Sequence, residues 1–538
     1  MILAGRDTGN RRQRLEEEIR EIEPGSGHRL KVVLVFPAPY SVGMANLGYQ
    51  LVYRLFNSIP GVCCHRAFAS AAALSDRMTP VLKPPVVLES GEPLTTYDVI
   101  AFSLNYENDL LNVPRMLRAA GLHPLQSRRG DRDPWVIAGG VSVTINPEPL
   151  ADILDFCVLG EAEHLLPDVC DILSHLRGMP KHAVLQDLAG IPGVYIPQFY
   201  QPEYCSDGAF RSIRYIGSGP APDLRRRIVP SLDAIPGSTV IHTPHTEFPK
   251  LHLVEISRGC PRNCRFCLIP GCYGPYRYRS LDSVLNAAEA VPAGWRVGLL
   301  GAGAADHPDL ATICRELTHR EIHFSFSSLH AGRITHDLAD AIRDFGPRTV
   351  TLAPEAGSDR RRKTLGKTIL NSELLEAVER VGRPPMKIIK VYFMIGLPGE
   401  TEEDLLAITD LCRHMEDRLR YINRRSKTIP RIAVGISCFV PKAMSPFERA
   451  PQCAEKTLKQ KLQFVIANLR KIRELRWTAD VPRWSAMQGI LARGDRRLSQ
   501  WFIESAKPGA DWRDGMRRSA VSGAFQPEQK IPLSAALP

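Results

Sequence analysis

Apolar runs that alternate with helical segments restrict the fold of this 538-residue chain more than any other feature of its sequence. The first run, "KVVLVF" at residues 31–36, ends at Pro37 and contains no polar alternation. A short continuous apolar run is typical of a strand that is buried on both faces of a parallel sheet. Comparable runs, each followed by a helical segment, lie at residues 98–104, 135–140 and 156–160. This order predicts a doubly wound α/β domain, Rossmann- or flavodoxin-like, over residues 31–177.

A second series of the same kind begins at residue 251. It follows a segment rich in Pro, Gly and Tyr, residues 178–250, which we expect to be a linker with small β elements. The predicted strands of the second series cover residues 252–257, 296–301, 323–329, 349–355, 387–396 and 431–440. Six βα units are fewer than the eight of a closed barrel. We therefore predict a partial (βα)6 barrel over residues 251–450.

The two ends of the chain have a helical character. Residues 1–30 are predicted to be an N-terminal helical segment, and residues 451–538 a C-terminal helical extension with a tail. No apolar run approaches the roughly 18 residues of a membrane span, and the N-terminal stretch turns charged too soon for a signal peptide. With 44% hydrophobic and 24% charged residues, the composition is that of an ordinary globular protein. We expect a cytoplasmic protein without a membrane partner.

An excess of basic residues bears on possible partners. The net charge is +11, and basic runs occur at Arg225–Arg227, Arg360–Lys363 and Arg424–Lys427. Such runs contact nucleic acid in some proteins. No aromatic stacking residue is interleaved with them, so we interpret them as solvated helix ends and loops and keep nucleic acid as the lesser alternative.

One segment, "RGCPRNCRFCLIPGC" at residues 258–272, gathers cysteines at close spacing. The other cysteines, out of 13, are scattered, and an odd number in a reducing compartment argues against a disulfide framework. Cys260, Cys264 and Cys267 follow directly after the first predicted barrel strand. Barrel enzymes place their active sites at that face. The segment therefore predicts a metal site.

Two kinds of metal site are compatible with these thiols. With Cys272 as a fourth ligand, a structural zinc site would close, although the segment has no second C-x2-C pair and no histidine pair. An iron–sulfur cluster of the 4Fe–4S type normally takes four thiolates, so three leave one iron open. Arg258, Arg262 and Arg265 would then offset the negative charge of the cluster and its thiolates.

The C-x3-C-x2-C spacing, its place after the first strand, and Phe266 just before the third cysteine resemble the radical S-adenosylmethionine (SAM) superfamily. The resemblance implies a 4Fe–4S cluster held by Cys260, Cys264 and Cys267, with Cys272 as a bystander. It also implies that the open iron binds SAM. An electron from a donor such as flavodoxin or ferredoxin would then cleave SAM reductively to a 5′-deoxyadenosyl radical.

The same resemblance implies further contacts to SAM at the ends of the later strands. The candidate residues are Gly301, Gly303, Ser327, Glu355, Gly396 and Gly399. The first two stand where the family has a glycine-rich turn, Ser327 is placed to reach the ribose, and Glu355 to accept hydrogen bonds. The last two lie in "FMIGLPGET", which resembles the motif beside the adenine, where glycine permits close backbone approach. Each also has a plain interpretation as a turn or helix start, and no catalytic acid or base is assigned.

Residues 136–163, "VIAGGVSVTINPEPLADILDFCVLGEAE", resemble the cobalamin-binding domain that one class of these enzymes carries before the barrel. The resemblance implies that Gly139 and Gly140 let the nucleotide tail of cobalamin pass close to the backbone. It places Gly160 and Glu161 in the same cleft. The Asp-x-His-x2-Gly motif that supplies a cobalt-binding histidine is absent, so cobalamin would bind without one. The alternative is an α/β domain that binds no corrinoid.

The leading functional hypothesis is a radical SAM enzyme that transfers a methyl group, or performs a related radical reaction, on an unknown substrate. A second hypothesis is methylthiotransfer to RNA or protein, in a class that binds another cluster through three N-terminal cysteines. Cys63, Cys64, Cys157 and Cys170 show no matching arrangement. A third hypothesis, outside enzymes, is a metal-stabilised binding or electron-transfer module.

Overall fold

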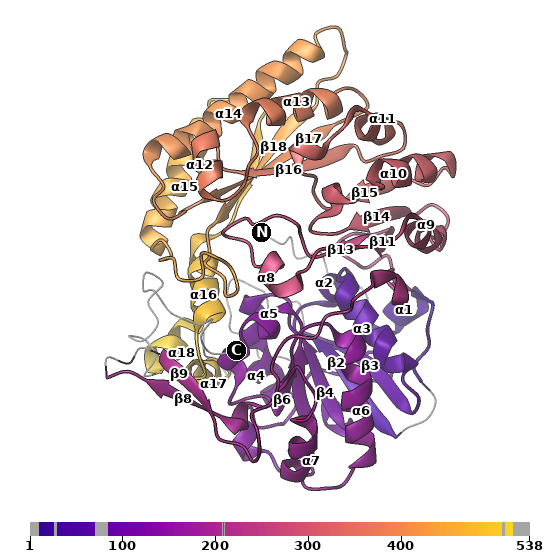
Figure 1. The fold of residues 1–538 in the computed structure, drawn as a ribbon, viewed down its shortest axis with the longest axis vertical. Helices are drawn as coiled ribbons and strands as arrows, with labels where there is room; N and C mark the ends of the chain where they lie inside the picture. The colour runs from indigo at the N-terminus through magenta and orange to yellow at the C-terminus, as the bar shows by residue number, and fades with distance from the viewer. Residues whose placement is uncertain are drawn as a thin grey trace.

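The predicted apolar runs form the strands of two lobes, which the C-terminal helices join (Figure 1). The computed structural model describes residues 10–25, 29–69, 84–206, 208, 210–507, 510 and 512–519. In Figure 1 the first lobe, indigo to magenta, lies below the second lobe, pink to orange, and the yellow helices run between them.

The sheet of the first lobe has six strands in the order β3-β2-β4-β5-β6-β7. They are β2 (Leu30–Phe36), β3 (Val62–Phe68), β4 (Val99–Ser103), β5 (Trp135–Gly139), β6 (Phe156–Val158) and β7 (Val194–Tyr195). All pairs are parallel except β6 with β7. The predicted doubly wound α/β fold is confirmed, and its strand order is flavodoxin-like. The order reverses between β2 and β4, and ligands of such folds bind at the carboxyl ends of the strands at that point.

Strand β3 was not predicted, because its sequence "VCCHRAF" carries His65 and Arg66. Arg66 is fully buried, and its guanidinium pairs with Glu18 at 2.7 Å and with Glu89 at 2.6 Å. A buried charge is tolerated when it is paired and hydrogen-bonded. The two carboxylates therefore let a cationic residue occupy a core strand.

The second lobe is a half-open barrel of parallel strands with helices outside it. One sheet holds β11 (Leu251–Glu255), β14 (Arg296–Leu300) and β15 (Phe324–Phe326), and the other holds β16 (Thr349–Glu355), β17 (Ile388–Ile395), β18 (Arg431–Cys438) and β19 (Arg476–Ala479). A single bridge between Leu329 and Leu352 connects the two sheets. The outer helices are α9 (Leu281–Glu289), α10 (Leu310–His319), α11 (His336–Asp344), α13 (Asn371–Val381) and α14 (Glu402–Ile422). The predicted partial barrel is confirmed.

The C-terminal extension contributes more than the predicted helices. Its first helix, α15 (Glu455–Leu469), is followed by β19, which pairs with β18 as a seventh parallel strand of the barrel. The stretch "RELRWTA" is too short and too charged to show strand periodicity, so this strand was missed. The chain then returns to the first lobe through α16 (Pro482–Arg493), α17 (Leu498–Ser505) and α18 (Trp512–Arg518). Trp501 and Phe502 are fully buried in the core of that lobe.

The segments on either side of the first sheet are mostly short. Before it lie α1 (Arg11–Glu16) and β1 (Ile19–Arg20), and β1 pairs with β10 (Ile241–His242). Helix α7 (Lys181–Leu188) precedes the last strand of the sheet, β7, and the hairpin of β8 (Tyr200–Tyr204) and β9 (Phe210–Tyr215) follows β7. The predicted tail beyond residue 519 and parts of residues 1–30 lie outside the described residues. None of the described helices has the length and apolar character of a membrane span.

A close backbone approach in the second lobe allows a test of this packing. Gly357 follows β16, and a β-carbon built there would overlap the backbone of Ala407 and Ile408 in α14. Overpacking of this kind costs about 1–3 kcal/mol. We expect Gly357→Ala to lower the thermal unfolding midpoint, followed by circular dichroism, while Gly130→Ala, where the space is open, leaves it unchanged. Equal midpoints for both variants would contradict the packing.

Candidate functional site

The cysteine loop is closed by a short hairpin at the carboxyl end of β11. β12 (Ser257–Arg258) pairs antiparallel with β13 (Arg277–Tyr278), so residues 259–276 form one loop between the paired ends. Within it, the backbone amide of Cys267 donates to the carbonyl of Cys264 at 3.0 Å, and a short helix, α8 (Ile269–Tyr273), follows. The three predicted ligands therefore lie on one compact turn at the mouth of the barrel.

Burial and nearby cations act in opposite directions on these thiols. Cys260, Cys264 and Cys267 are partly exposed, and burial raises the pKa of each, that of Cys267 to about 11. The positive charges of Arg262 and Lys367 lower the pKa of Cys260 and Cys264. Cations beside a thiol favour the thiolate, which is the form that binds metals.

Among the described residues, no three His, Cys, Asp or Glu side chains are arranged to hold a single metal ion.

Cys272 has a different environment from the other three. It is only 4% exposed, in α8, and packs with Ile145 of the first lobe and Ala443 of the second. Burial raises the pKa of its thiol to about 12. These are the surroundings of a packed, neutral thiol, and they support its predicted role as a bystander.

Glu355 and Phe266 lie beside the cysteine loop. Glu355 ends β16 with φ 67°, an uncommon backbone conformation for a non-glycine residue. Burial raises the pKa of its carboxyl group, and Lys367, whose Nζ lies 3.2 Å from Oε1, opposes that shift. Phe266 packs against the apolar cluster that contains Leu397 and Phe439, at the ends of β17 and β18. Both residues are therefore at the mouth of the barrel.

The other residues proposed to contact SAM lie nearby, and packing explains several of them. Gly303 accepts a hydrogen bond from Tyr276 at 3.0 Å, and a β-carbon there would press on the tyrosine ring. Gly396 has φ +78°, and a β-carbon there would overlap Leu458 of α15. Gly399 has φ +70°, and Ser327 is exposed just beyond β15. None of these four lines the cavity described below.

His330 is a residue at this face that the sequence reasoning missed. It lies beyond β15, and both of its ring nitrogens are enclosed without a hydrogen-bond partner among the described residues. Burial, together with the charges of Arg262 and Lys367, lowers its pKa to about 4. Its position three residues after Ser327, just beyond a predicted strand, could have marked it as a candidate residue of this face.

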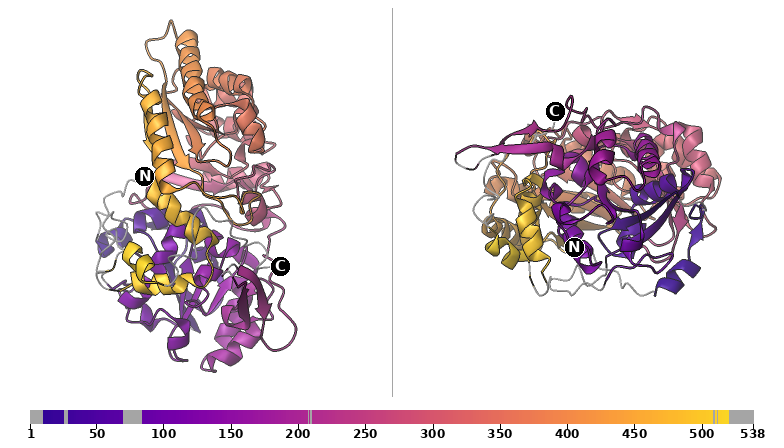
Figure 2. Two further views of the ribbon diagram at one scale, coloured as in Figure 1. Left: turned by 90° about the vertical axis from the view of Figure 1, so that its left-hand side faces the viewer. Right: turned by 90° about the horizontal axis from the view of Figure 1, so that it is seen from below.

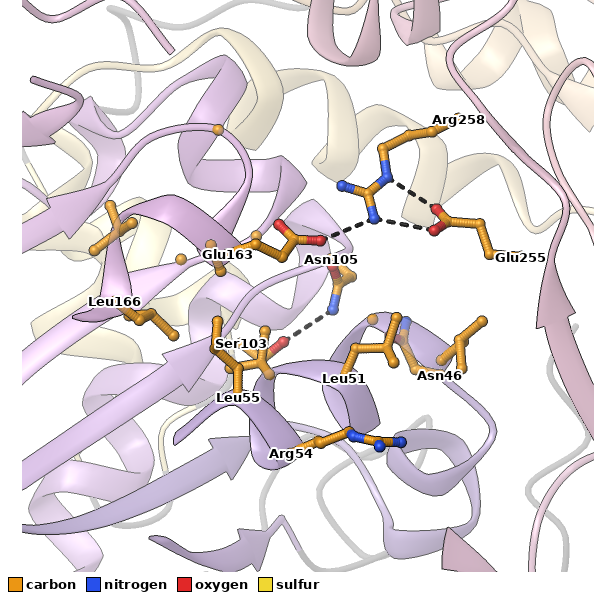
Figure 3. Close-up of a pocket in the computed structure, with 18 of the residues that line it drawn as sticks. Asn46, Leu51, Arg54, Leu55, Ser103, Asn105, Glu163, Leu166, Glu255 and Arg258 are labelled. Carbon is orange, nitrogen blue, oxygen red and sulfur yellow. Dashed lines mark hydrogen bonds and ion pairs between the residues drawn. The ribbon is translucent and has the colours of Figure 1, made fainter. Parts of the chain in front are cut away.

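A cavity of about 760 Å³ lies at the carboxyl ends of β2, β4, β5 and β6, where it meets the second lobe (Figure 3). Its walls are largely apolar, with Leu51, Leu55 and Leu166 among them, and the strand ends add Ser103 and Asn105. The predicted residues that line it are Gly139, Gly140, Gly160 and Gly301. The cavity thus occupies the point where the strand order reverses, and Arg258 and Gly259 extend it to the cysteine loop.

The glycines that line the cavity differ in how much room there is for a side chain at each position. Gly140 has φ +103° and Gly160 has φ +98°, and β-carbons there would overlap the backbone of Leu104 and of Arg227. Gly139 differs, because a β-carbon there would have its nearest neighbour at 3.9 Å. Chain packing therefore requires glycine at 140 and 160, while a side chain at 139 has room.

Glu161 does not line the cavity but forms buried ion pairs. Its carboxylate lies 2.6 Å from Arg277 and 3.1 Å from Arg258, and it accepts the backbone N–H of Val229 at 2.6 Å. Burial raises the pKa of Glu161, but the two arginines outweigh burial and hold it below its usual range. Glu163, two positions later in the chain, lines the cavity in place of the expected Glu161.

Two family models match this architecture. "Radical SAM proteins, N-terminal" matches residues 48–197, and "Radical SAM superfamily" matches residues 254–412. The chain carries the two domains that these models describe in radical SAM proteins. The second match contains the cysteine loop, and the first contains the cavity side of the first lobe.

Known proteins resemble the chain to different extents. Uncharacterized protein MJ0966 of Methanocaldococcus jannaschii is 28% identical over 434 residues, which are 78% of this chain and 83% of the relative. The structure of the radical SAM methyltransferase TsrM from Kitasatospora setae, with cobalamin and a 4Fe–4S cluster bound, matches with TM-score 0.53 at 14% identity. It covers 92% of this chain and 100% of TsrM, and shares the fold.

A tRNA-modifying enzyme matches over a smaller part. tRNA-2-methylthio-N(6)-dimethylallyladenosine synthase of Mycolicibacterium paratuberculosis is 27% identical over 216 residues. The match covers 36% of this chain and 41% of that enzyme.

The enclosed, unpartnered imidazole of His330 leads to a stability prediction. A buried polar group without a partner costs about 1–3 kcal/mol, so His330→Leu is expected to raise the thermal midpoint of the metal-free protein. The pKa of His330, lowered to about 4, lies below the roughly 6.5 of an unfolded histidine. Between these pH values the unfolded chain binds more protons, and the wild-type protein loses stability as pH falls.

The difference in midpoint between the leucine variant and wild type should therefore widen from pH 7.5 to pH 5, measured by differential scanning fluorimetry. His336→Leu, at the exposed first position of α11, is the control and should show no such widening. A lower midpoint for His330→Leu at every pH would show that the imidazole is satisfied.

Proposed function

We propose that this enzyme holds a 4Fe–4S cluster on Cys260, Cys264 and Cys267, binds SAM at the open iron, and binds cobalamin in the cavity. Its reaction would be methyl transfer, or a related radical reaction, on a substrate still to be identified. The observation that carries the proposal is the continuity of the cavity with the cysteine loop, through Arg258 and Gly259. When bound, the cluster with SAM supplies a carbon radical and cobalamin supplies a methyl carrier.

The residues around the loop are suited to a cluster. Arg262 is held by Asp306 at 2.7 Å, so its charge stays beside the thiols. Phe266 and its apolar cluster shield one side of the loop from water. Lys367, paired with Glu355, adds a second fixed charge near Cys264. Fixed charges and restricted water access are the means by which a protein tunes an iron–sulfur cluster.

The cavity is suited to part of a large cofactor. Its volume of about 760 Å³ lies within the range of about 300–1,000 Å³ typical of ligand pockets. No histidine is among the described residues that line it. His65, on β3, is instead hydrogen-bonded to the hydroxyl group of Tyr97 at 2.6 Å.

The surroundings of the N-terminal cysteines argue against the methylthiotransferase alternative. Cys63, Cys64, Cys157 and Cys170 are all buried in the first lobe. Burial raises the pKa of each thiol, that of Cys170 to about 12. Buried neutral thiols in a sheet core are poor ligands for a second cluster.

Serine substitutions test the cluster site. We expect Cys260→Ser, Cys264→Ser and Cys267→Ser each to lose the cluster, since each removes a ligand, whereas Cys272→Ser keeps it. The measurements are iron and sulfide content after anaerobic reconstitution, and electron paramagnetic resonance of the reduced protein with and without SAM. 5′-Deoxyadenosine after dithionite addition gives the cleavage activity.

If Cys272→Ser also lost its iron, Cys272 would be a fourth ligand, and the site would be closed rather than open. A reduced wild-type signal that ignores SAM, or no 5′-deoxyadenosine, would reject the radical proposal.

A substitution that fills the cavity tests cobalamin binding. Gly139→Leu is expected to weaken hydroxocobalamin binding at least 100-fold, because the side chain has room to extend from the strand end into the cavity. Gly130→Leu, in open space away from the cavity, should bind as wild type does. Binding is followed by the corrin absorption change. If Gly139→Leu bound as tightly as wild type, the corrinoid would lie elsewhere.

A further inference from the structure

One arginine connects the cavity with the cysteine loop. Arg258 lines the cavity and lies two residues before Cys260. Its side chain is only 11% exposed, and its guanidinium contacts three carboxylates. Figure 3 shows two of these contacts, to Glu163 and to Glu255, meeting at the edge of the cavity.

The three carboxylates come from both lobes. Glu255, at the end of β11, receives two hydrogen bonds from Arg258, at 2.9 and 3.0 Å. Glu161 and Glu163, which follow β6 of the first lobe, lie 3.1 and 2.9 Å from the same guanidinium. A planar guanidinium with a fixed fork of donors holds such a geometry with little freedom. The position of Arg258 is thus determined by both lobes together.

Glu163 differs from the other two carboxylates. Glu161 is also paired with Arg277, and Glu255 with Arg279 at 3.1 Å. Among the described residues, Arg258 is the one cation within ion-pair distance of Glu163. Glu163 also forms part of the cavity wall, and its side chain is 19% exposed. Of the three carboxylates, Glu163 is therefore the one that both meets a ligand in the cavity and depends on Arg258 alone.

We infer that Arg258 and Glu163 are positioning residues that couple occupancy of the cavity to occupancy of the cysteine loop. Metal bound at the cysteines would hold residues 259–276 more firmly, and with them Arg258, the residue just before them. Arg258 then holds Glu163 in place on the cavity wall, where its carboxylate accepts hydrogen bonds from the amide groups of a corrinoid. Whichever ligand binds first bears the ordering cost, so the second binds more tightly.

The coupling acts in both directions, because a factor by which one ligand changes the affinity of the other is reciprocal. Couplings between sites typically amount to about 5- to 150-fold in affinity. One ion pair is the connection here, so we expect the lower part of that range, about 10-fold. The inference rests on the proposed function, since it takes a corrinoid as the cavity ligand.

The test compares hydroxocobalamin affinity in cluster-loaded and cluster-free protein, by absorption titration under anaerobic conditions. The wild-type protein should bind about 10-fold more tightly after reconstitution. Glu163→Gln keeps the shape and loses the charge, so reconstitution should change its affinity less than 2-fold. The control is Glu203→Gln in β8. The Glu203 side chain is 42% exposed, pairs with Arg214 and lies outside the cavity lining, so this variant should behave as wild type does.

A second measurement separates coupling from a merely structural effect. Hydroxocobalamin should slow the removal of iron by bathophenanthroline disulfonate in the wild-type protein and in Glu203→Gln, but not in Glu163→Gln. A variant that had only lost packing would release iron faster in both conditions and still respond to the corrinoid.

The possible outcomes distinguish failure of the coupling from failure of the proposed cobalamin binding. If hydroxocobalamin does not bind the cluster-loaded wild-type protein, the cobalamin proposal fails, and the coupling fails with it. If it binds equally well with and without the cluster, the cofactor proposal stands and the coupling is overturned. If Glu163→Gln retains the full coupling, the path through Arg258 is overturned.

Discussion

The shape of the cysteine loop depends on one buried carboxylate, that of Glu161. It belongs to the first lobe, yet it pairs with Arg258 and Arg277, which form the two sides of the hairpin that closes the loop. Removing one partner of a buried ion pair is costly, about 3–5 kcal/mol, because it leaves a charge unpaired. The loop that carries the cluster ligands is therefore supported by charge pairs with the neighbouring lobe.

A second set of polar contacts joins the lobes across the sheet end. Lys442, in the loop after β18, pairs with Glu107 at 2.6 Å, and Gln488 of α16 donates to the same carboxylate at 2.8 Å. Burial and the charge of Glu107 raise the pKa of the adjacent Asp109 to about 8. The side view in Figure 2 shows the C-terminal helices running along both lobes beside this junction. The relative position of the lobes, and hence the cavity between them, is set by directional contacts from three separate segments.

The sequence predicted the strands that consist of apolar residues. It did not predict the strands that contain charged residues, which are stabilised by partners elsewhere in the chain. "KVVLVF" and the six barrel strands were recognised from their apolar character, and the structure confirms them. β3 was missed because Arg66 meets its carboxylates only in the folded chain. The short β19 was missed because its charged sequence shows no strand periodicity, and its pairing with β18, as of Thr478 with Gly435, exists only in the folded chain.

The candidate site divides in the same way. The spacing of the cysteines and the glycines at the strand ends was readable in the chain, and the structure brings Gly139, Gly140 and Gly160 to one cavity. Glu161 and Glu163 are both carboxylates of one short motif. Only the folded structure shows that Glu161 pairs with both Arg258 and Arg277, whereas Glu163 pairs with Arg258 and also lines the cavity. The roles of the cluster and cofactor residues stay predictions.

The return of the chain to the first lobe has a consequence for how this protein reaches its native state. The core of that lobe contains Trp501 and Phe502, and Arg496 pairs with Glu148 across 348 residues of sequence. Contacts between such distant segments form slowly, because a long loop must close before they add stability. On a ribosome, the first lobe would remain an unfinished apolar surface until the whole barrel had been synthesised. Folding helpers that shield exposed apolar surface are therefore expected to act on the first lobe, and the space between the lobes can take its final form only after the last helices dock.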